Sequence, residues 1–303
     1  MQLTKCSLPD FRKRFDSDFT CLSYLASLKW DAGFTCRRCA HAVSMKGDRN
    51  LDKRCQRCGY NETPTAHTVF HSMKIPLVLA FEMVYRICVS KKGISSLALS
   101  REYDLNPKTG YNFKRKIQLS MKSSEKHPLE GLVHVDEFVV GGKEVGCQGR
   151  SSETEKKRVV VAVEVIKSKK KLIMGRAYAL SIENYSSSEL QKLFDKHISA
   201  DAKIETDGWS GYKPLSESYK IKQTYSDKGK NFPTIHTLIM NVKNWIRGTH
   251  HSVSENHIQK YLDEFCFRLN RRTFINSMPI FLLNRIAITN HTPVKLSERG
   301  YYG

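Results

Sequence analysis

The sequence predicts a mixed α/β protein made of a small metal-stabilised module, a helical region and a larger α/β domain. Three observations support this division. Two CxxC pairs lie close together near the N-terminus, apolar residues then recur with helical spacing, and the pattern changes to strand alternation after Pro128. The expected parts are residues 1–72, 73–127 and 128–290, followed by a C-terminal tail over 291–303.

Composition and charge indicate a globular protein with a polyanionic partner. Of the 303 residues, 40% are hydrophobic and 26% are charged, which is enough to build a core. Fifty Lys and Arg residues against thirty Asp and Glu residues give a formal net charge of +20, and such an excess favours nucleic acid through phosphate contacts and counterion release. No apolar run reaches the length of a membrane span, and the N-terminus has no hydrophobic signal core, so we expect a cytoplasmic protein without a membrane partner.

Four of the nine cysteines form a paired pattern: CRRC, fifteen residues, then CQRC. These four residues are Cys36, Cys39, Cys55 and Cys58. Each CxxC places two thiolates on one tight turn, and two such turns complete a tetrahedron around a zinc ion. Two disulfides are the alternative, but the odd number of cysteines and the absence of a signal segment disfavour them. Since four thiolates leave no open position for water, we predict a structural zinc and not a zinc-dependent enzyme.

An apolar helical stretch at 75–89 precedes a helix-turn-helix pattern. Residues 94–101 have helical spacing, residues 103–106 make a short turn, and Pro107 starts a second helix. The cations that we expect to contact DNA from this second helix are Lys108, Lys114, Arg115 and Lys116. Small helical hairpins that do not bind DNA share the same pattern.

The order of elements after Pro128 indicates the fold of the third part. Strand-like runs at 132–140, 159–166 and 172–180 are followed by a helix at 187–197 and a short strand at 203–207. Three consecutive strands, a helix and another strand form the opening order of an RNase-H-like fold. The fold class predicted is therefore an RNase-H-like α/β domain preceded by a zinc ribbon and a helix-turn-helix.

Acidic residues lie where two of these strands would place them together. Asp136 lies in the first strand and Asp207 closes the last. Because successive side chains on a strand point to opposite faces, we expect only one of Asp136 and Glu137 to join a site. Two aspartates on neighbouring strands can share Mg²⁺ ions, which activate a water or a 3′-hydroxyl for attack on a phosphodiester. Spacing alone leaves open that both are ordinary strand-end acids.

Several segments resemble one family. The stretches HVDEFVVGGK, ETDGWSGY and NVKNWIRGTHHSVSENHIQKYLDEFCFRLNRR, together with the paired cysteines, resemble bacterial insertion-sequence transposases of the DDE type, in the ISXO-like, Merlin-related class. The resemblance runs from about Phe34 to Asn270. It implies an acidic triad that uses Mg²⁺ or Mn²⁺ to cut and join DNA at inverted terminal repeats. It also implies double-stranded DNA partners (element ends and target site), a homo-oligomer on DNA and association with the nucleoid. Asp136 and Asp207 would be the first two members of the triad.

The third member of the triad is where this sequence departs from the commonest family pattern. The family position lies seven residues before a lysine; here the lysine is Lys243 and the residue is His236, where many relatives carry Glu or Asn. A neutral imidazole can ligate a divalent metal, although it prefers softer ions than Mg²⁺, or it can accept a proton from the attacking water. Glu264 and Glu255 are the alternatives. Lys243 lies on the same helix face as His236, where it is expected to contact a DNA phosphate.

The last predicted helix, over residues 254–272, is amphipathic and carries Arg268 and Arg271, which we expect to contact DNA. The predicted function is therefore that of a transposase that binds terminal inverted repeats and catalyses metal-dependent strand cleavage and strand transfer. The alternative is a domesticated or decayed copy that acts as a DNA-binding regulator. Such a copy would retain the zinc ribbon and the helix-turn-helix but would lack turnover.

Overall fold

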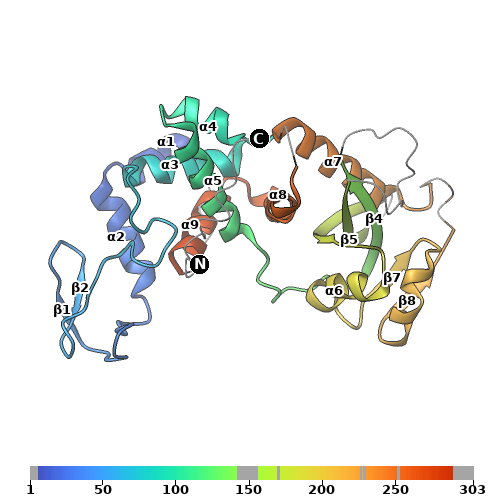
Figure 1. The fold of residues 1–303 in the computed structure, drawn as a ribbon, viewed down its shortest axis with the longest axis horizontal. Coiled ribbons are helices and arrows are strands. Elements are labelled where there is room, and N and C mark those ends of the chain that lie inside the picture. Colours follow the sequence, from blue (N-terminus) through green and yellow to red (C-terminus); the bar gives the residue numbers. More distant parts are fainter. Residues whose placement is uncertain are drawn as a thin grey trace. The chain divides into compact units, whose positions relative to one another are not determined.

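The computed structural model divides the chain into two compact units. It describes residues 6–141, 156–168, 171–225, 227, 230–250 and 253–288. The first unit comprises Met1–Ser120 and Phe274–Tyr302, and the second comprises Met121–Thr273 (Figure 1). The expected domain over 128–290 therefore differs from the observed division at its C-terminal end, and the expected tail over 291–303 lies outside the described residues.

The core of the first unit is helical. Its helices include α1 (Leu8–Arg14), α2 (Asp18–Lys29), α3 (Leu77–Val89) and α9 (Met278–Ile288). Capping boxes begin α1 and α2, in which Ser7 and Ser17 accept hydrogen bonds from backbone N–H groups that have no partner inside the helix. Most of the side chains of α3 are buried, and this helix contacts α1, α2 and α9. This packing is the reason why α9 belongs to the first unit: its apolar side chains complete the core around α3.

Cys55 lies in a small antiparallel sheet of β1 (Ser44–Lys46), β2 (Lys53–Cys55) and β3 (Asn61–Glu62), and the other three paired cysteines lie in the segments before β1 and between β2 and β3. Lys29, at the end of α2, attaches this sheet to the helix. Its ammonium group is paired with Glu62 at 2.8 Å and donates hydrogen bonds to the carbonyls of Thr63 and Ala66 at 2.9 and 2.8 Å. Because these partners replace the water that burial removes, the charged lysine can lie inside the protein.

The helical pattern predicted after residue 93 is present as α4 (Ser96–Glu102) and α5 (Pro107–Met121), joined by a turn in which Asp104 has a φ of 50°. The two helices are in close contact at Gly110. A Cβ atom at Gly110 would lie 2.1 Å from the Oγ atom and 3.2 Å from the Cβ atom of Ser100. Only glycine therefore permits this distance between α4 and α5 without a shift.

The second unit is built on a five-stranded sheet in the order β6-β5-β4-β7-β8. Its strands are β4 (Leu132–Val140), β5 (Lys157–Ser168), β6 (Lys171–Ile182), β7 (Lys203–Thr206) and β8 (Lys220–Gln223). The pairs among β6, β5 and β4 are antiparallel, whereas β7 pairs in parallel with β4 and with β8. The helix α6 (Ser187–His197) connects β6 to β7, so the predicted order of three strands, a helix and a strand is confirmed.

Helices cover both faces of this sheet. The helices α7 (Pro233–Thr249) and α8 (Glu255–Leu269) pack with residues such as Phe138 and Val161, and α6 packs with the alternate residues such as Val135. This alternation along each strand buries both faces, as expected for a sheet between two helical layers. No helix among the described residues is long and apolar enough to cross a membrane.

Amide side chains from α8 and the residue after it lie along β6, the edge strand of the sheet. Gln259 accepts a hydrogen bond from the backbone of Ser181 at 2.9 Å and donates one to the carbonyl of Ala179 at 3.2 Å. Asn270 makes the same pair of bonds to Ala177, at 2.8 and 3.0 Å. These four bonds fix α8 against the edge of the sheet.

Candidate functional site

The four paired cysteines converge on one point. The Sγ atoms of Cys36 and Cys58 are 3.6 Å apart, as are those of Cys39 and Cys55, and all four lie within 4.8 Å of one another. Thiolates bound to zinc at about 2.3 Å in a tetrahedron would be separated by about 3.8 Å. A disulfide requires about 2.05 Å, and all four are free thiols. The donor set and its geometry therefore fit a closed zinc site.

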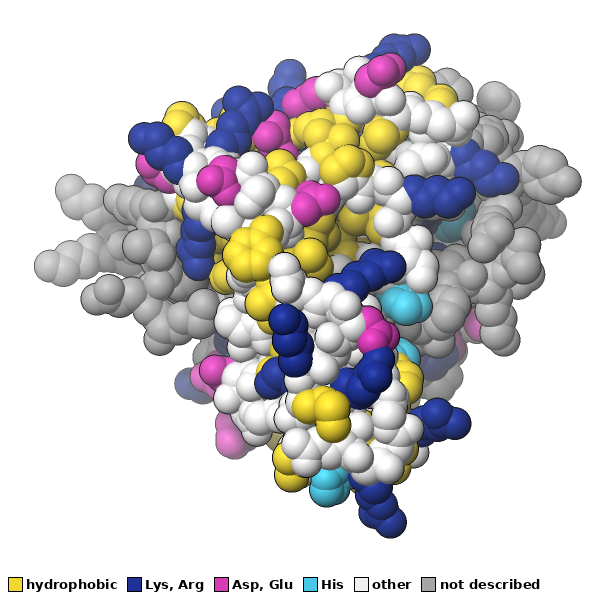
Figure 2. Space-filling model, turned by 90° about the vertical axis from the view of Figure 1, so that its left-hand side faces the viewer, with side chains coloured by type: hydrophobic (Ala, Val, Ile, Leu, Met, Phe, Trp, Pro, Cys, Tyr) yellow, Lys and Arg dark blue, Asp and Glu magenta, His cyan; other side chains and the backbone are white. Residues whose placement is uncertain are grey.

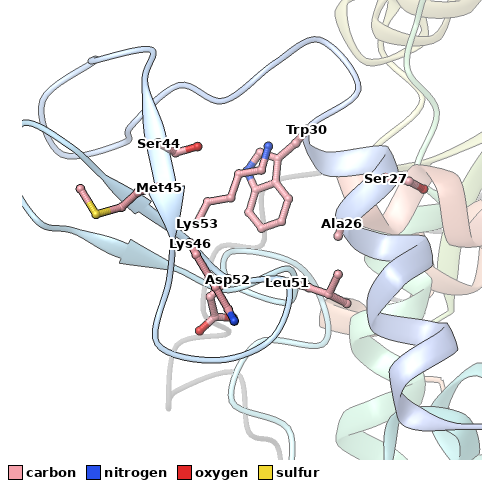
Figure 3. A pocket seen from close by; sticks show the side chains of 9 residues that line it. All are labelled: Ala26, Ser27, Trp30, Ser44, Met45, Lys46, Leu51, Asp52 and Lys53. Atoms are coloured by element: carbon pink, nitrogen blue, oxygen red, sulfur yellow. The ribbon is translucent and has the colours of Figure 1, made fainter.

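The basic residues around this site are partly engaged within the first unit. Arg37 pairs with Glu62 at 3.2 Å, Arg54 pairs with Asp48, and the ammonium group of Lys53 lies 4.9 Å from the centroid of the Trp30 ring. An open hollow of about 570 Å³ lies between α2 and the small sheet (Figure 3). Its lining residues are Ala26, Ser27, Trp30, Ser44, Met45, Lys46, Leu51, Asp52 and Lys53. On the side of the molecule drawn in Figure 2, Lys and Arg side chains are spread among hydrophobic ones and do not form a single patch.

A second cluster lies in the second unit, where Asp136, Glu137 and Asp207 have carboxylate oxygens within 4.8 Å of one another. All three residues are half-buried. The expectation that only one of Asp136 and Glu137 joins the site is therefore wrong. The parallel pairing of β7 with β4 ends at Val135 and Thr206. Beside Asp136 and Glu137, therefore, no paired β7 residue lies between the two faces of the sheet. A long glutamate side chain can reach Asp207 around this open end.

The segment after Asp207 holds that residue in place and adds a tyrosine to the cluster. Asp207 accepts a hydrogen bond from the backbone N–H of Trp209 at 3.0 Å, and Gln223 donates to the carbonyls of both residues. The side chain of Tyr212 is fully buried. Burial raises the pKa of Tyr212 well above its usual value, and the neighbouring carboxylates, Glu137 foremost, raise it further. Sequence reasoning missed Glu137 and Tyr212; for Tyr212, the position of GWSGY directly after Asp207 was the available signal.

The helix α7 brings His236 and Lys243 to the same cluster. The His236 Nε2 atom lies 3.9 Å from an Asp136 carboxylate oxygen, and 41% of the histidine side chain is exposed. Lys243 lies two turns further along, with its ammonium group 5.5 Å from the Phe138 ring centroid. Burial lowers the pKa of Lys243, and the charge of Asp136 opposes that effect. Helical spacing thus places an imidazole and a cation on the face of α7 that covers Asp136.

The two alternative glutamates do not belong to the cluster of three carboxylates. Glu264 is fully buried and lies 3.8 Å from Arg268. Glu255 is exposed and lies 4.0 Å from Lys157. Of the three candidates for a third position, only His236 lies beside Asp136 in the part of the chain that the structure describes.

The cations predicted on the second helix of the helix-turn-helix differ in exposure. Lys108 is exposed and Lys116 is half-buried. Lys114, by contrast, is buried and donates a hydrogen bond to the carbonyl of Ile94 at 2.6 Å. Arg115 is also buried; it donates to the Tyr111 hydroxyl at 2.9 Å, and its guanidinium lies 4.9 Å from that ring. The prediction of surface cations is therefore wrong for Lys114 and Arg115, because both side chains turn back onto their own unit.

The two arginines predicted at the end of α8 are also occupied by their own helix. The Arg268 side chain is 11% exposed and lies 3.8 Å from Glu264, one helical turn away. Arg271 donates to the carbonyl of Phe267 at 3.1 Å, and its guanidinium lies 4.0 Å from the Phe267 ring. Both residues therefore act first as packing groups that keep a charge near the surface.

The second cluster fits a hard divalent cation. Three carboxylates supply the oxygen ligands that Mg²⁺ and Mn²⁺ prefer, and their partial exposure leaves room for water and a substrate oxygen. The fold and this cluster define an α/β domain whose three carboxylates fit such a cation. The model of the ISXO2-like transposase domain matches residues 128–270, and the model of the transposase zinc-ribbon domain matches residues 16–61. The chain therefore carries a transposase zinc-ribbon domain followed by an ISXO2-like transposase domain. No curated protein matches it.

Proposed function

We propose that the protein is a transposase that binds the terminal inverted repeats of an insertion sequence and catalyses metal-dependent DNA strand cleavage and strand transfer. The single observation that carries this proposal is the carboxylate cluster of Asp136, Glu137 and Asp207 inside a domain that matches ISXO2-like transposases. The order β6-β5-β4-β7-β8, with antiparallel strands on one side and parallel strands on the other, supports an RNase-H-like fold for this domain.

In this proposal the carboxylates of Asp136, Glu137 and Asp207 hold one or two Mg²⁺ or Mn²⁺ ions. Such ions, when bound, make a water or a 3′-hydroxyl nucleophilic and stabilise the leaving oxygen of the phosphodiester. His236 either completes the ligand set or accepts the proton of the attacking group, since its Nε2 atom is 3.9 Å from Asp136. Lys243 holds a non-bridging phosphate oxygen near the same carboxylate.

DNA contact is assigned to both units. In the first unit, the zinc ribbon is a basic module shaped by its metal, and the exposed Lys108 is the cation of α5 best placed to meet a phosphate. The partners in this proposal are the element ends and the target duplex, bound by a homo-oligomer of the protein. For a protein with this activity, we expect a cytoplasmic location and association with the nucleoid.

The experiment that tests the proposal compares Asp136→Asn, Asp207→Asn and the exposed control Glu217→Gln on a plasmid that carries the inverted repeats flanking the gene. We expect the two aspartate variants to lose cleavage and to retain binding to an end duplex, whereas the control keeps both. Retained cleavage by both aspartate variants would contradict the site. His236→Glu adds a carboxylate and should shift the preference from Mn²⁺ toward Mg²⁺; an unchanged preference would assign His236 to packing.

The same experiment distinguishes an active transposase from a DNA-binding regulator. A wild-type protein that binds the end duplex but cleaves in neither Mg²⁺ nor Mn²⁺ would be a DNA-binding regulator derived from a transposase. The presence of all three carboxylates favours the active enzyme.

A further inference from the structure

The hairpin between β5 and β6 extends beyond the rest of the sheet. The strand β4 pairs with β5 only as far as Val133 and Glu164, but β5 and β6 remain paired for four more residue pairs. We call this extension the β5–β6 arm. It consists of Val165–Ser168 and Lys171–Met174.

The base of the arm is rigidly fixed. Between Val163 and Val165 the register shifts, which marks a β-bulge, and bulges bend a strand and change its direction. Glu164 and Arg176 are paired at 2.5 Å beside the bulge, and Arg176 also donates to the carbonyl of Pro128 at 2.9 Å. Gly175 permits the close approach, since a Cβ atom there would lie 2.7 Å from Glu164 Cβ. The arm therefore begins at a β-bulge whose position is fixed by the Glu164–Arg176 ion pair.

The surface of the arm is both basic and apolar. Ile166, Leu172 and Ile173 are 52%, 44% and 39% exposed, and Ile166 and Ile173 are paired across the two strands. Lys167 and Lys171 are exposed beside them. The sequence from Val165 to Met174 contains four lysines and no acidic residue; two of these lysines lie outside the described residues. Exposed apolar side chains beside cations on a projecting hairpin indicate a binding surface, because the charges keep the apolar groups soluble without covering them.

We propose that the β5–β6 arm is a DNA-contacting element of the transposase, with its lysines on backbone phosphates and the Ile166–Ile173 pair against base edges in the groove. The uniform positive charge is complementary to a polyanion and repels a second copy of the same arm. A two-stranded ribbon has the right width for the major groove, where apolar side chains meet thymine methyl groups. This inference rests on the proposed function, because it assumes that the substrate is duplex DNA.

The arm would contact the duplex away from the reacting phosphodiester. Asp136 is paired with Val161, and Ile166 lies five residues further along β5. Five residues of extended strand span about 17 Å. At about 3.4 Å per base pair, this separation corresponds to about five base pairs along the duplex. The arm thus contributes to holding the DNA and not to the chemistry.

The test measures binding of the full-length, zinc-loaded protein to a duplex that carries the flanking inverted repeat, as a function of salt. For Lys167→Gln/Lys171→Gln, we expect the slope of log K against log salt to become less steep by about 1.8, since each lost phosphate contact removes about 0.9. The control Lys196→Gln/Lys222→Gln removes two exposed lysines elsewhere on the same unit and should leave the slope unchanged. Equal slopes for the wild type and the arm variant, or equal changes in both variants, would overturn the proposal.

A second variant examines the apolar pair. Ile166→Ser/Ile173→Ser should weaken binding at an unchanged salt slope, because it removes groove contacts and keeps the charges. If this variant instead changes the oligomeric mass measured without DNA while binding stays unchanged, the arm is a protein interface and the proposal fails. A wild-type protein that does not bind the duplex would contradict the proposed function itself and the arm with it, whereas wild-type binding that no arm variant alters would contradict the arm alone.

Discussion

Replacing Glu137 with Gln should stabilise the second unit in the absence of divalent cations and weaken its response to them. Three carboxylates lie within 4.8 Å of one another at this site. Two unit charges at that separation repel by about 3.5 kcal/mol at an effective dielectric constant of about 20. Counterions and small side-chain movements reduce this repulsion, so we expect a net gain of about 1–2 kcal/mol for the metal-free variant. In a unit of this size, that gain corresponds to about 2–8 °C in Tm.

Calorimetry on zinc-loaded protein, in buffer depleted of free divalent cations and then with saturating Mg²⁺ or Mn²⁺, measures both effects. The wild type should gain more in Tm on metal addition than Glu137→Gln does, because binding relieves a repulsion that the variant has already lost. The exposed control Glu217→Gln should behave as the wild type in both buffers. A Glu137→Gln variant that is less stable without metal and responds fully to Mg²⁺ would refute the reasoning, since its carboxylate would then be a structural partner and not a ligand.

Two further predictions concern stability. Gly110→Ala should destabilise the first unit by about 1–3 kcal/mol, because the new methyl group meets Ser100. The cost of this contact exceeds the ~1 kcal/mol that alanine gains over glycine in helix propensity. In urea unfolding, adding Ser100→Gly should recover part of the loss, and strictly additive effects of the two substitutions would contradict the close contact. Burial lowers the pKa of His197 to about 4, from an ordinary value near 6.5, so its contribution to stability is fully present above about pH 6.5 and is lost as the pH falls toward 4. His197→Phe should flatten the dependence of Tm on pH in that window, and an unchanged profile would assign the dependence to other groups.

The zinc site was predictable from short spacing, and the proximity of the two aspartates was predictable from strand order. Two CxxC turns bring four thiolates together whatever the rest of the chain does, and strand order alone places Asp136 beside Asp207. Glu137 was not predictable, since alternation starts its side chain on the opposite face from Asp136 but keeps the two carboxylates apart only where a neighbouring strand lies between them, and the β7 ladder ends one residue before Asp136. Sequence reports where strands occur better than it reports how far their pairing extends.

The positions of charged side chains were also difficult to predict from the sequence. Lysines and arginines on an amphipathic helix were assigned to the surface by type, yet Lys114 reaches a carbonyl inside its own unit. A long aliphatic stem allows a cation to begin on a buried face and still find a polar partner, and the helical pattern does not record that choice.

The amide side chains along β6 limit the pairing of this edge strand with strands of other molecules. An edge strand normally offers its N–H and C=O groups to any passing strand, which is the route to aggregation and to unintended pairing between copies. Gln259 and Asn270 occupy those groups at Ala177, Ala179 and Ser181 with one donor and one acceptor each, so they imitate a sixth strand that cannot itself be extended. Aspartate at position 270 would keep the acceptor but lose the donor, leaving the Ala177 carbonyl facing a negative charge. From Ala177 to Ser181 this edge of the sheet therefore ends at two neutral amides, and replacing them with acids would free backbone groups for pairing with another copy.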